Sequence, residues 1–274
     1  MPMPSWKLTD RVMRLESTQV MGILNVTPDS FSDGGRYATP QAAAEAALAM
    51  QAAGAAVIDV GGQSTRPEHT PVSAEEEWQR LCPVLEVLAG RLTVPVSVDT
   101  YYPSVAERAL AMGVQIINDV SGSLENGMLA VAANSGAGLV LTCPAADSVE
   151  GVTLYFERAL AAAEAAGMDR QQVCLDVGIG FGKTRELDME LIRRLPALTA
   201  RFPRQPFLIG GSRKRVVATF TGANRPPSER LAGTLALHTL AQVGGAHLLR
   251  VHDVPEACDA VRLTEAFLER SKKE

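Results

Sequence analysis

The sequence predicts a single (β/α)8 barrel of the α/β class, a TIM barrel, with a short N-terminal hairpin. Eight short apolar runs rich in Val, Ile and Leu recur along the 274 residues, and none alternates cleanly with polar residues. Such runs are typical of strands that are buried on both faces. Stretches with helical periodicity separate and follow the runs, so eight βα units occupy the chain as one domain, residues 1–274.

A doubly wound open sheet is the alternative architecture for alternating strands and helices. The barrel is favoured because the runs number eight and because no GxGxxG motif follows the first of them. We expect the first nineteen residues to form a hairpin or plug beneath the barrel. No linker or low-complexity segment points to a second domain.

The predicted strands coincide with the apolar runs, and glycines precede several of them. A glycine just before a strand is typical of the tight turn that ends a helix, and Gly54, Gly113, Gly136 and Gly245 occupy such positions. The strands are predicted at residues 20–26, 55–61, 94–100, 114–120, 138–143, 173–178, 206–211 and 246–251.

The segments between the strands carry helical signals. Residues 40–54 begin with Pro40 and end at Gly54, which matches the preference for proline in the first turn and glycine at the end. Residues 73–90 begin with Ser73 and carry Glu76 three positions later, the spacing of a capping box. Weaker helical patterns cover residues 103–112, 125–135, 152–167, 188–202, 226–243 and 255–270.

The composition argues against several classes of protein. The net charge is −5 and there is no basic run, so no nucleic-acid-binding surface is expected. No apolar run is long enough to span a bilayer, and the N-terminus lacks the apolar core of a signal peptide, so we expect a cytoplasmic protein with no membrane partner. The four cysteines and four histidines lack CxxC and HxxxH spacing, which argues against a structural zinc site.

Every predicted strand ends in polar or reactive side chains. In a barrel, functional groups lie at the carboxyl ends of the strands and in the loops that follow. A single buried carboxylate can belong to a structural ion pair, but eight polar strand ends on one rim favour a functional site. These residues are Asn25, Asp59, Asp99, Thr100, Asn118, Asp119, Thr142, Cys143, Asp176, Ser212, Arg213, Lys214, Arg250, His252 and Asp253.

The first group of these residues suits a flat polar heterocycle. Asp99, Asn118, Asp176 and Lys214 combine acceptors and donors deep in the predicted barrel mouth. A carboxylate accepts two parallel N–H bonds from a guanidine-like ring edge, and an asparagine side chain both donates and accepts.

The second group suits a phosphate or pyrophosphate. Arg66, Arg250 and His252 offer cationic donors, and we expect them nearer the rim than the first group. Asn25 offers a neutral oxygen that can reach a hard cation such as Mg²⁺, which commonly bridges phosphate oxygens.

Two loops are unusual. The stretch MGILNVTPDSFSDGG (21–35) runs from a strand into a polar loop longer than an ordinary βα connection, with Phe31 at its middle. We expect residues 27–35 to close over bound pyrophosphate, with Phe31 beside Pro67 as an apolar lid. The stretch GIGFGKT (178–184) is no P-loop, because that motif needs glycine where Val177 stands, but it can shape a pocket wall.

From about residue 20 to residue 268, the chain resembles the dihydropteroate synthases of folate biosynthesis. The fragments that carry the resemblance occur in the order found in that family, and the first, second and last are specific. They are GILNVTPDSFSDGG, IDVGGQSTRP, VSVDT, INDVSG, DVGIGFGK, GGSRK and RVHDV.

The resemblance implies a (β/α)8 barrel that joins 6-hydroxymethyl-7,8-dihydropterin pyrophosphate to p-aminobenzoate with Mg²⁺ and releases pyrophosphate. It also implies a sulfonamide target. It implies small-molecule substrates and a homodimer formed through helices near the C-terminal end of the chain. It assigns the pterin to Asp99, Asn118, Asp176 and Lys214. It assigns the pyrophosphate to Asn25, Asp59, Arg66, Arg250 and His252, with Asn25 on the metal. It assigns p-aminobenzoate to Phe31, Thr65, Arg66, Pro67 and Ser212. It makes Asn25, Asp59, Arg66, Asp99, Lys214, Arg250 and His252 the catalytic set.

The chain also departs from the family pattern. Gln63 and Val177 stand where the family usually has Glu and Pro, and Ile179 where it has an aromatic residue. The fifth strand ends in Thr142 and Cys143 instead of a Met-His-Met type sequence, and the loop after it is shorter. Two alternatives therefore stay open: a pterin-binding paralogue with lost or altered condensation activity, and a pterin methyltransferase domain of the corrinoid type.

Overall fold

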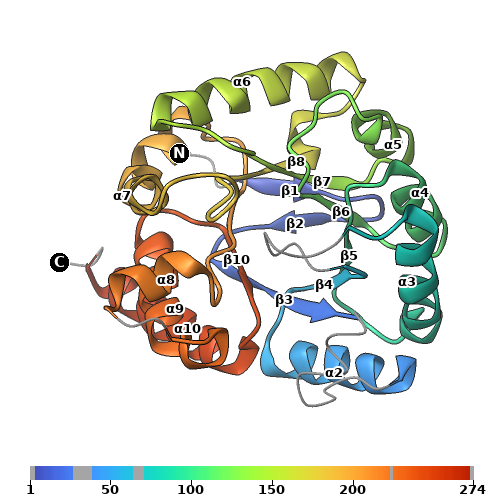
Figure 1. Cartoon of the computed structure of the whole chain (residues 1–274), viewed down its shortest axis with the longest axis horizontal. Coiled ribbons are helices and arrows are strands. Elements are labelled where there is room, and N and C mark those ends of the chain that lie inside the picture. The colour runs from blue at the N-terminus through green and yellow to red at the C-terminus, as the bar shows by residue number, and fades with distance from the viewer. Residues whose placement is uncertain (1–3, 27–38, 64–70, 223–224, 272–274) are drawn as a thin grey trace.

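The computed structural model describes residues 4–26, 39–63, 71–222 and 225–271. In this part of the chain, eight parallel strands close into a barrel in the order β10-β3-β4-β5-β6-β7-β8-β9. Figure 1 shows the strands at the centre of a ring of helices. The predicted (β/α)8 barrel is therefore confirmed, and the open sheet is not formed.

The strands follow one another around the barrel in chain order, and β10 closes the ring on β3, where Arg250 lies opposite Met21. Strand β3 is as long as its predicted run but begins one residue earlier, and the other strands are shorter than their runs and lie within them. They are β3 (Gln19–Asn25), β4 (Val57–Gly61), β5 (Val96–Asp99), β6 (Ile116–Asp119), β7 (Gly138–Thr142), β8 (Val173–Asp176), β9 (Phe207–Ile209) and β10 (Leu248–Val251).

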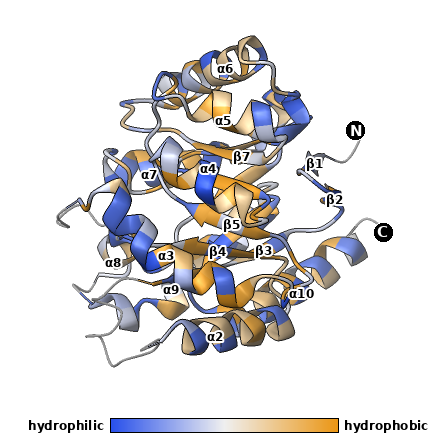
Figure 2. Ribbon diagram, turned by 90° about the vertical axis from the view of Figure 1, so that its right-hand side faces the viewer, coloured by the Kyte–Doolittle hydropathy of each residue, from blue (hydrophilic) through white to orange (hydrophobic). Residues whose placement is uncertain are grey.

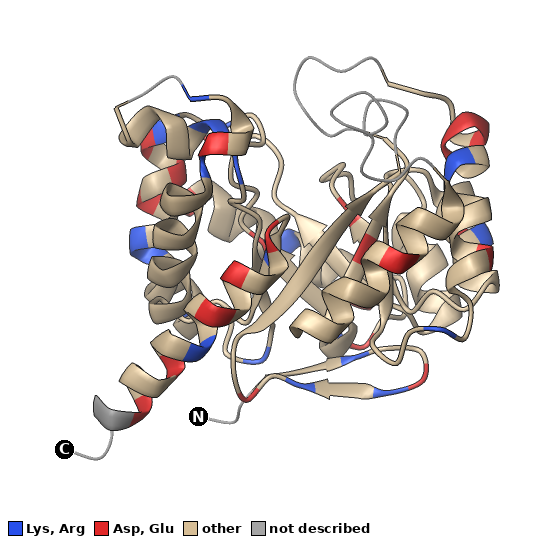
Figure 3. Cartoon of the chain, turned by 90° about the horizontal axis from the view of Figure 1, so that it is seen from below, with Lys and Arg blue, Asp and Glu red and all other residues tan. Residues whose placement is uncertain are grey.

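The helices cover the outside of the barrel, and apolar and polar residues alternate along them (Figure 2). Their buried apolar residues pack in the larger core cluster. Residues of both charges are spread over the helices (Figure 3). Thr39 caps the first one and Ser73 the second, where its hydroxyl accepts from the Glu76 amide as the sequence predicted. The helices are α2 (Pro40–Ala53), α3 (Ala74–Leu88), α4 (Pro103–Ala111), α5 (Met128–Ser135), α6 (Val149–Ala165), α7 (Arg185–Arg201), α8 (Arg215–Phe220), α9 (Leu231–Val243) and α10 (Val254–Ser271), with short 3-10 turns η1 (Arg170–Gln172) and η2 (Pro227–Glu229).

The segment after β9 differs from the prediction of one helix over residues 226–243. Helix α8 precedes it, and α9 begins only at Leu231. Pro226 and Pro227 explain the late start, because proline disfavours a helical conformation in the residue before it and lacks an amide donor.

Alternating residues of each strand divide the core into two layers. Outward-facing residues such as Leu139 and Leu141 pack against the helices. Inward-facing residues such as Val57 and Val140 form a smaller cluster with Trp6 at the bottom of the barrel. This alternation follows from the period of two in a strand.

The N-terminal hairpin plugs the bottom of the barrel, as predicted. Strands β1 (Ser5–Lys7) and β2 (Val12–Arg14) pair antiparallel and cross the centre of the ring in Figure 1. The Trp6 indole donates to the Gln172 carbonyl over 2.8 Å. A β-carbon on Gly138 would overlap Leu8, so glycine at the start of β7 leaves room for the plug.

Candidate active site

Polar side chains line the barrel above the apolar plug. They lie two residues beyond inward-facing apolar residues of the same strands, so the period of two turns them into the interior as well. The pairs are Val57 and Asp59, Ile116 and Asn118, Cys174 and Asp176, and Leu248 and Arg250. Four distant segments of sequence thus contribute to one interior surface.

Arg250 joins two carboxylates of this surface. Its Nε lies 2.6 Å from Asp59 Oδ2, and its Nη2 donates to Asp99 Oδ2. Asn118 Nδ2 donates to the same Asp59 oxygen over 3.0 Å. We call this interior surface the floor of the site; its residues are Asp59, Asp99, Asn118, Asp176, Lys214 and Arg250. We expected Arg250 nearer the rim, but its guanidinium lies among these residues because strand β10 extends to Val251 and carries Arg250 inside the barrel.

Several oxygens of the floor are buried without a partner. Asp59 Oδ1, Asp99 Oδ1 and Asn118 Oδ1 have no hydrogen bond among the described residues, and neither has the Ser97 hydroxyl. An unpaired buried polar atom costs about 1–3 kcal/mol. The arrangement is therefore suited to a ligand that brings donors into the barrel.

Burial changes the proton affinity of this floor. It raises the pKa of Asp99 to about 7, against the opposing effect of Arg250 and with help from Asp59. It raises the pKa of Asp176 as well. It lowers the pKa of Lys214 to about 8, with Asp176 acting in the opposite direction.

Lys214 lies against the glycine-rich loop predicted to form a pocket wall. Its Nζ donates to the Ile179 carbonyl and lies 4.2 Å from the centroid of the Phe181 ring. Gly178 adopts φ +69°, and a β-carbon there would overlap the Cys143 carbonyl. The loop therefore needs glycine at this position to pack against the end of β7.

Lys183 was not singled out from the sequence, although it stands in the same loop. Its buried Nζ donates to the carbonyls of Cys143 (2.8 Å), Pro144 (2.5 Å) and Gly178 (3.2 Å). It thereby ties the loop after β8 to the end of β7. Its position at the end of a glycine-rich loop is the sequence feature that could have identified Lys183.

Ser212 and His252 meet at the rim between β9 and β10. The Ser212 hydroxyl lies 2.9 Å from His252 Nδ1 and accepts from the His252 amide over 3.2 Å. Beside them, Arg213 has φ +58° and forms an ion pair with Asp253, with Nε 3.0 Å from Oδ2. The sequence placed all four at strand ends, but it did not show that Arg213 and Asp253 pair.

Asn25 lies beside the floor, at the end of β3. A β-carbon on Gly61 would lie 3.3 Å from Asn25 Oδ1 and 3.7 Å from Asp99 Oδ2, so both side chains border Gly61. Among the described residues, no group of three His, Cys, Asp or Glu side chains could hold a metal. The Asn25 side chain offers one neutral amide oxygen, the kind of ligand that Mg²⁺ takes when phosphate oxygens and water supply its other ligands.

Some predicted site residues lie outside the described residues. These are Phe31, Thr65, Arg66 and Pro67, together with the predicted lid of residues 27–35. Cys143 is described, and its side chain is buried in the outer layer beside Leu141, away from the barrel interior. The Cys143 thiol therefore does not face the barrel interior.

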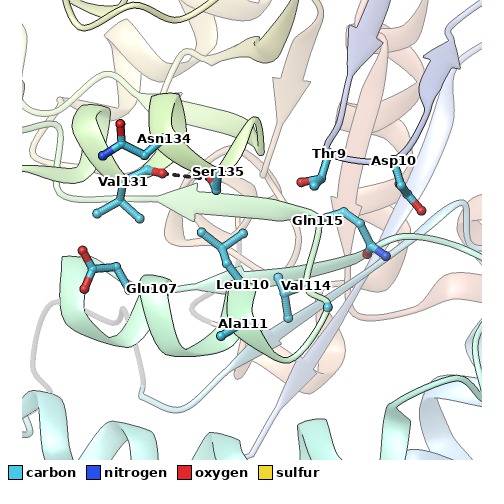
Figure 4. Close-up of a pocket in the computed structure, with 11 residues that line it drawn as sticks. Thr9, Asp10, Glu107, Leu110, Ala111, Val114, Gln115, Val131, Asn134 and Ser135 are labelled. Atoms are coloured by element: carbon cyan, nitrogen blue, oxygen red, sulfur yellow. Dashed lines mark hydrogen bonds between the residues drawn. The ribbon is translucent and has the colours of Figure 1, made fainter.

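A separate cavity of 540 Å³ lies at the opposite end of the barrel, beside the hairpin (Figure 4). Thr9 and Asp10 border it on one side and helices α4 and α5 on the other. None of the polar floor residues lines it, so it is distinct from the candidate site.

Comparisons with known proteins agree with this geometry. Residues 21–252 match the model of the pterin binding enzyme family. The dihydropteroate synthase of Escherichia coli K12 is 43% identical over 268 residues, covering 93% of each chain. A structure of the Xanthomonas albilineans dihydropteroate synthase with 4-aminobenzoic acid is 40% identical, with a TM-score of 0.90 over 97% of this chain and 99% of that one. The same enzyme in complex with 7,8-dihydropteroate is 38% identical, with a TM-score of 0.86 over 96% and 98%.

Proposed function

This chain belongs to the pterin binding enzyme family, and we infer from its relatives and its barrel floor that it is a transferase with dihydropteroate synthase activity. It condenses 6-hydroxymethyl-7,8-dihydropterin pyrophosphate with p-aminobenzoate to give 7,8-dihydropteroate and pyrophosphate. The observation that carries this function is the set of buried, unpartnered oxygens on Asp59, Asp99 and Asn118.

The floor residues complement the edge of a pterin ring. Asp99 and Asp176 offer carboxylate oxygens, Asn118 offers an amide oxygen, and Lys214 offers a donor. A pterin carries an amino group and ring nitrogens along one edge, so it can satisfy acceptors that the protein leaves unpaired. We therefore assign the pterin to these four residues.

Two groups of the reaction would be contacted at the rim and on the floor. The pyrophosphate would be bound by Arg250 and His252, and p-aminobenzoate by Ser212. The reaction breaks the bond between the pterin methylene carbon and a pyrophosphate oxygen, and it forms a carbon–nitrogen bond to the amine of p-aminobenzoate, which loses a proton. Arg250 and His252 offer positive or donor groups for the departing oxygens, and the Asp59 and Asp99 carboxylates stabilise positive charge on the ring.

We propose Mg²⁺ as the cofactor, with Asn25 as the protein ligand. When bound, the ion would supply positive charge to the pyrophosphate oxygens. The single amide oxygen of Asn25 near Asp99 supports an ion whose other ligands are phosphate oxygens and water.

The alternative of an altered paralogue loses part of its basis. The altered paralogue was motivated by the changed end of β7, but one of the two changed residues, Cys143, packs in the outer layer and does not face the interior. Thr142, the residue before it, shares the inward face of Val140.

A condensation assay tests the function. The purified protein is incubated with dihydropterin pyrophosphate, p-aminobenzoate and Mg²⁺, and dihydropteroate and pyrophosphate are measured. We expect both in equal amounts. Methyl transfer from methyltetrahydrofolate to a corrinoid, with no dihydropteroate, would instead support the methyltransferase alternative.

We also propose a cytoplasmic homodimer. The four cysteines are free thiols, as is usual in a reducing compartment. Leu240 and Val243 on α9 are each 55% exposed and Leu263 on α10 is 75% exposed, which supports an apolar contact between late helices. Among the described residues, none of the helices has the length and apolar composition to cross a membrane. Sedimentation equilibrium and cell fractionation test the two proposals.

A further inference from the structure

Thr142 ends strand β7 with a hydroxyl that has no hydrogen-bond partner. The residue is fully buried, and its Oγ1 makes no hydrogen bond within the described part of the chain. Most buried hydroxyls have a hydrogen-bond partner, so this one is available to a polar group that a ligand brings into the barrel.

The alternation of β7 turns Thr142 toward the barrel interior. Leu139 and Leu141 pack in the outer layer against the helices, whereas Val140 belongs to the inner cluster. Thr142 shares the face of Val140. It also lies directly opposite Asp176 in the pairing of β7 with β8.

The methyl group and the hydroxyl of Thr142 point in different directions. A β-carbon on Gly178 would lie 3.2 Å from the Thr142 methyl carbon, so the methyl group packs toward the glycine-rich loop. The hydroxyl occupies a different staggered position. Asn118 on β6 and Asp176 on β8 flank β7 on the same inner surface, and Asn118 Oδ1 is also unpaired.

We propose that the Thr142 hydroxyl hydrogen-bonds the bound pterin ring and helps to select this heterocycle, between Asn118 and Asp176. A hydroxyl both donates and accepts, so it can pair with either a ring N–H or a bare ring nitrogen. The proposal deepens the proposed function and rests on it. It gives β7 a role in substrate recognition in place of the Met-His-Met type sequence.

Thr142→Val tests the proposal, because valine keeps the shape and removes only the hydroxyl. Calorimetry with 6-hydroxymethylpterin should show a roughly two- to tenfold weaker Kd, the loss expected for one neutral hydrogen bond. The melting temperature should be equal to or above that of the unmodified protein, because no hydrogen bond within the protein is lost. Thr142→Ser should keep the original Kd.

Thr264→Val is the matched control. The Thr264 hydroxyl donates to the Ala260 carbonyl within α10, far from the barrel interior, so its loss should leave the Kd unchanged. An unchanged Kd in Thr142→Val, or a lower melting temperature as its only effect, would overturn the proposal. A parallel condensation assay on the unmodified protein separates the two failures. If that protein bound no pterin and made no dihydropteroate, the proposed function itself would fail. If it did both, only the role of Thr142 would be in question.

Discussion

The guanidinium of Arg250 lies 2.6 Å from the carboxylate of Asp59, Nε to Oδ2, in the interior of the barrel. The pair joins the last strand of the chain to β4, and the same guanidinium also contacts Asp99. Arg250 therefore neutralises two buried carboxylates, and under the proposed function it also binds the pyrophosphate. Its roles in stability and in binding have to be measured separately.

Arg250→Ala should weaken both folding and anion binding. Removing the cation leaves two uncompensated buried carboxylates, and breaking a buried pair in this way costs about 3–5 kcal/mol. Urea denaturation measures that loss. Calorimetry should show a larger loss of affinity for pterin pyrophosphate than for 6-hydroxymethylpterin. Equal losses for the two ligands would remove Arg250 from the anion site.

The matched control is Arg201→Ala. Arg201 forms an exposed ion pair with Glu157 on the outer helices, 2.7 Å apart. Its removal should change stability by less than about 1 kcal/mol and leave both affinities unchanged.

Glu77→Gln should change how stability depends on pH. Glu77 is buried in α3, where it accepts from the Thr100 hydroxyl over 2.8 Å, and burial raises its pKa from 4.5 to about 7. A raised pKa contributes stability that is present below pH 4.5 and is lost as the pH rises through about 7, on the order of 3 kcal/mol. The variant escapes this loss.

The difference in melting temperature, variant minus unmodified protein, should therefore increase as the pH rises over this interval and then level off. Glu76→Gln is the control, since Glu76 lies on the same turn but forms an exposed ion pair with Arg80. A difference that stays flat for Glu77→Gln would show that Glu77 keeps its proton affinity on folding.

Gly138→Ala should destabilise the protein by displacing the plug. A β-carbon on Gly138 would overlap Leu8 and lie 3.1 Å from the Trp6 ring. Overpacking of this kind costs about 1–3 kcal/mol, which urea denaturation can detect. Gly151→Ala in helix α6 meets only ordinary contacts of 3.4 Å or more and should be neutral or stabilising. Equal stability of the two variants would contradict the packing of the hairpin.

A thiol reagent applied to the folded protein should label Cys82 first. Cys82 is half-buried on α3, whereas Cys143, Cys174 and Cys258 are buried. Burial also raises the pKa of Cys143 to about 11, so little thiolate is present near neutral pH. Mass spectrometry identifies the modified residue. If Cys143 were labelled rapidly and pterin blocked the labelling, its thiol would line the binding site and the outer-layer packing would be contradicted.

The barrel and much of its floor could be predicted because strand order determines both. Apolar runs show where strands lie, and the fold places their carboxyl ends on one rim, so Asp99, Asn118 and Asp176 could be grouped from sequence alone. The hairpin and the capping residue Ser73 depend on local sequence and were also predicted. Thr39 caps a helix in the same way but was not identified from the sequence.

The remaining features depend on side-chain direction and on long-range contact. Which way Cys143 and Thr142 face depends on the register of β7, and a shift of one residue exchanges the two faces. The depth of Arg250 depends on where β10 ends. The ion pair of Arg213 with Asp253 joins residues 40 positions apart, which no local pattern reveals.

The most direct test of the pterin floor is calorimetric titration of Asp99→Ala with 6-hydroxymethylpterin. Removing this acceptor should weaken the Kd roughly ten- to a hundredfold, the range for a hydrogen bond to a charged group. Asp10→Ala removes an exposed carboxylate at the opposite end of the barrel and should bind as the unmodified protein does. If folded Asp99→Ala bound the pterin with the original Kd, the ring would lie elsewhere and the assignment of the barrel floor would be contradicted.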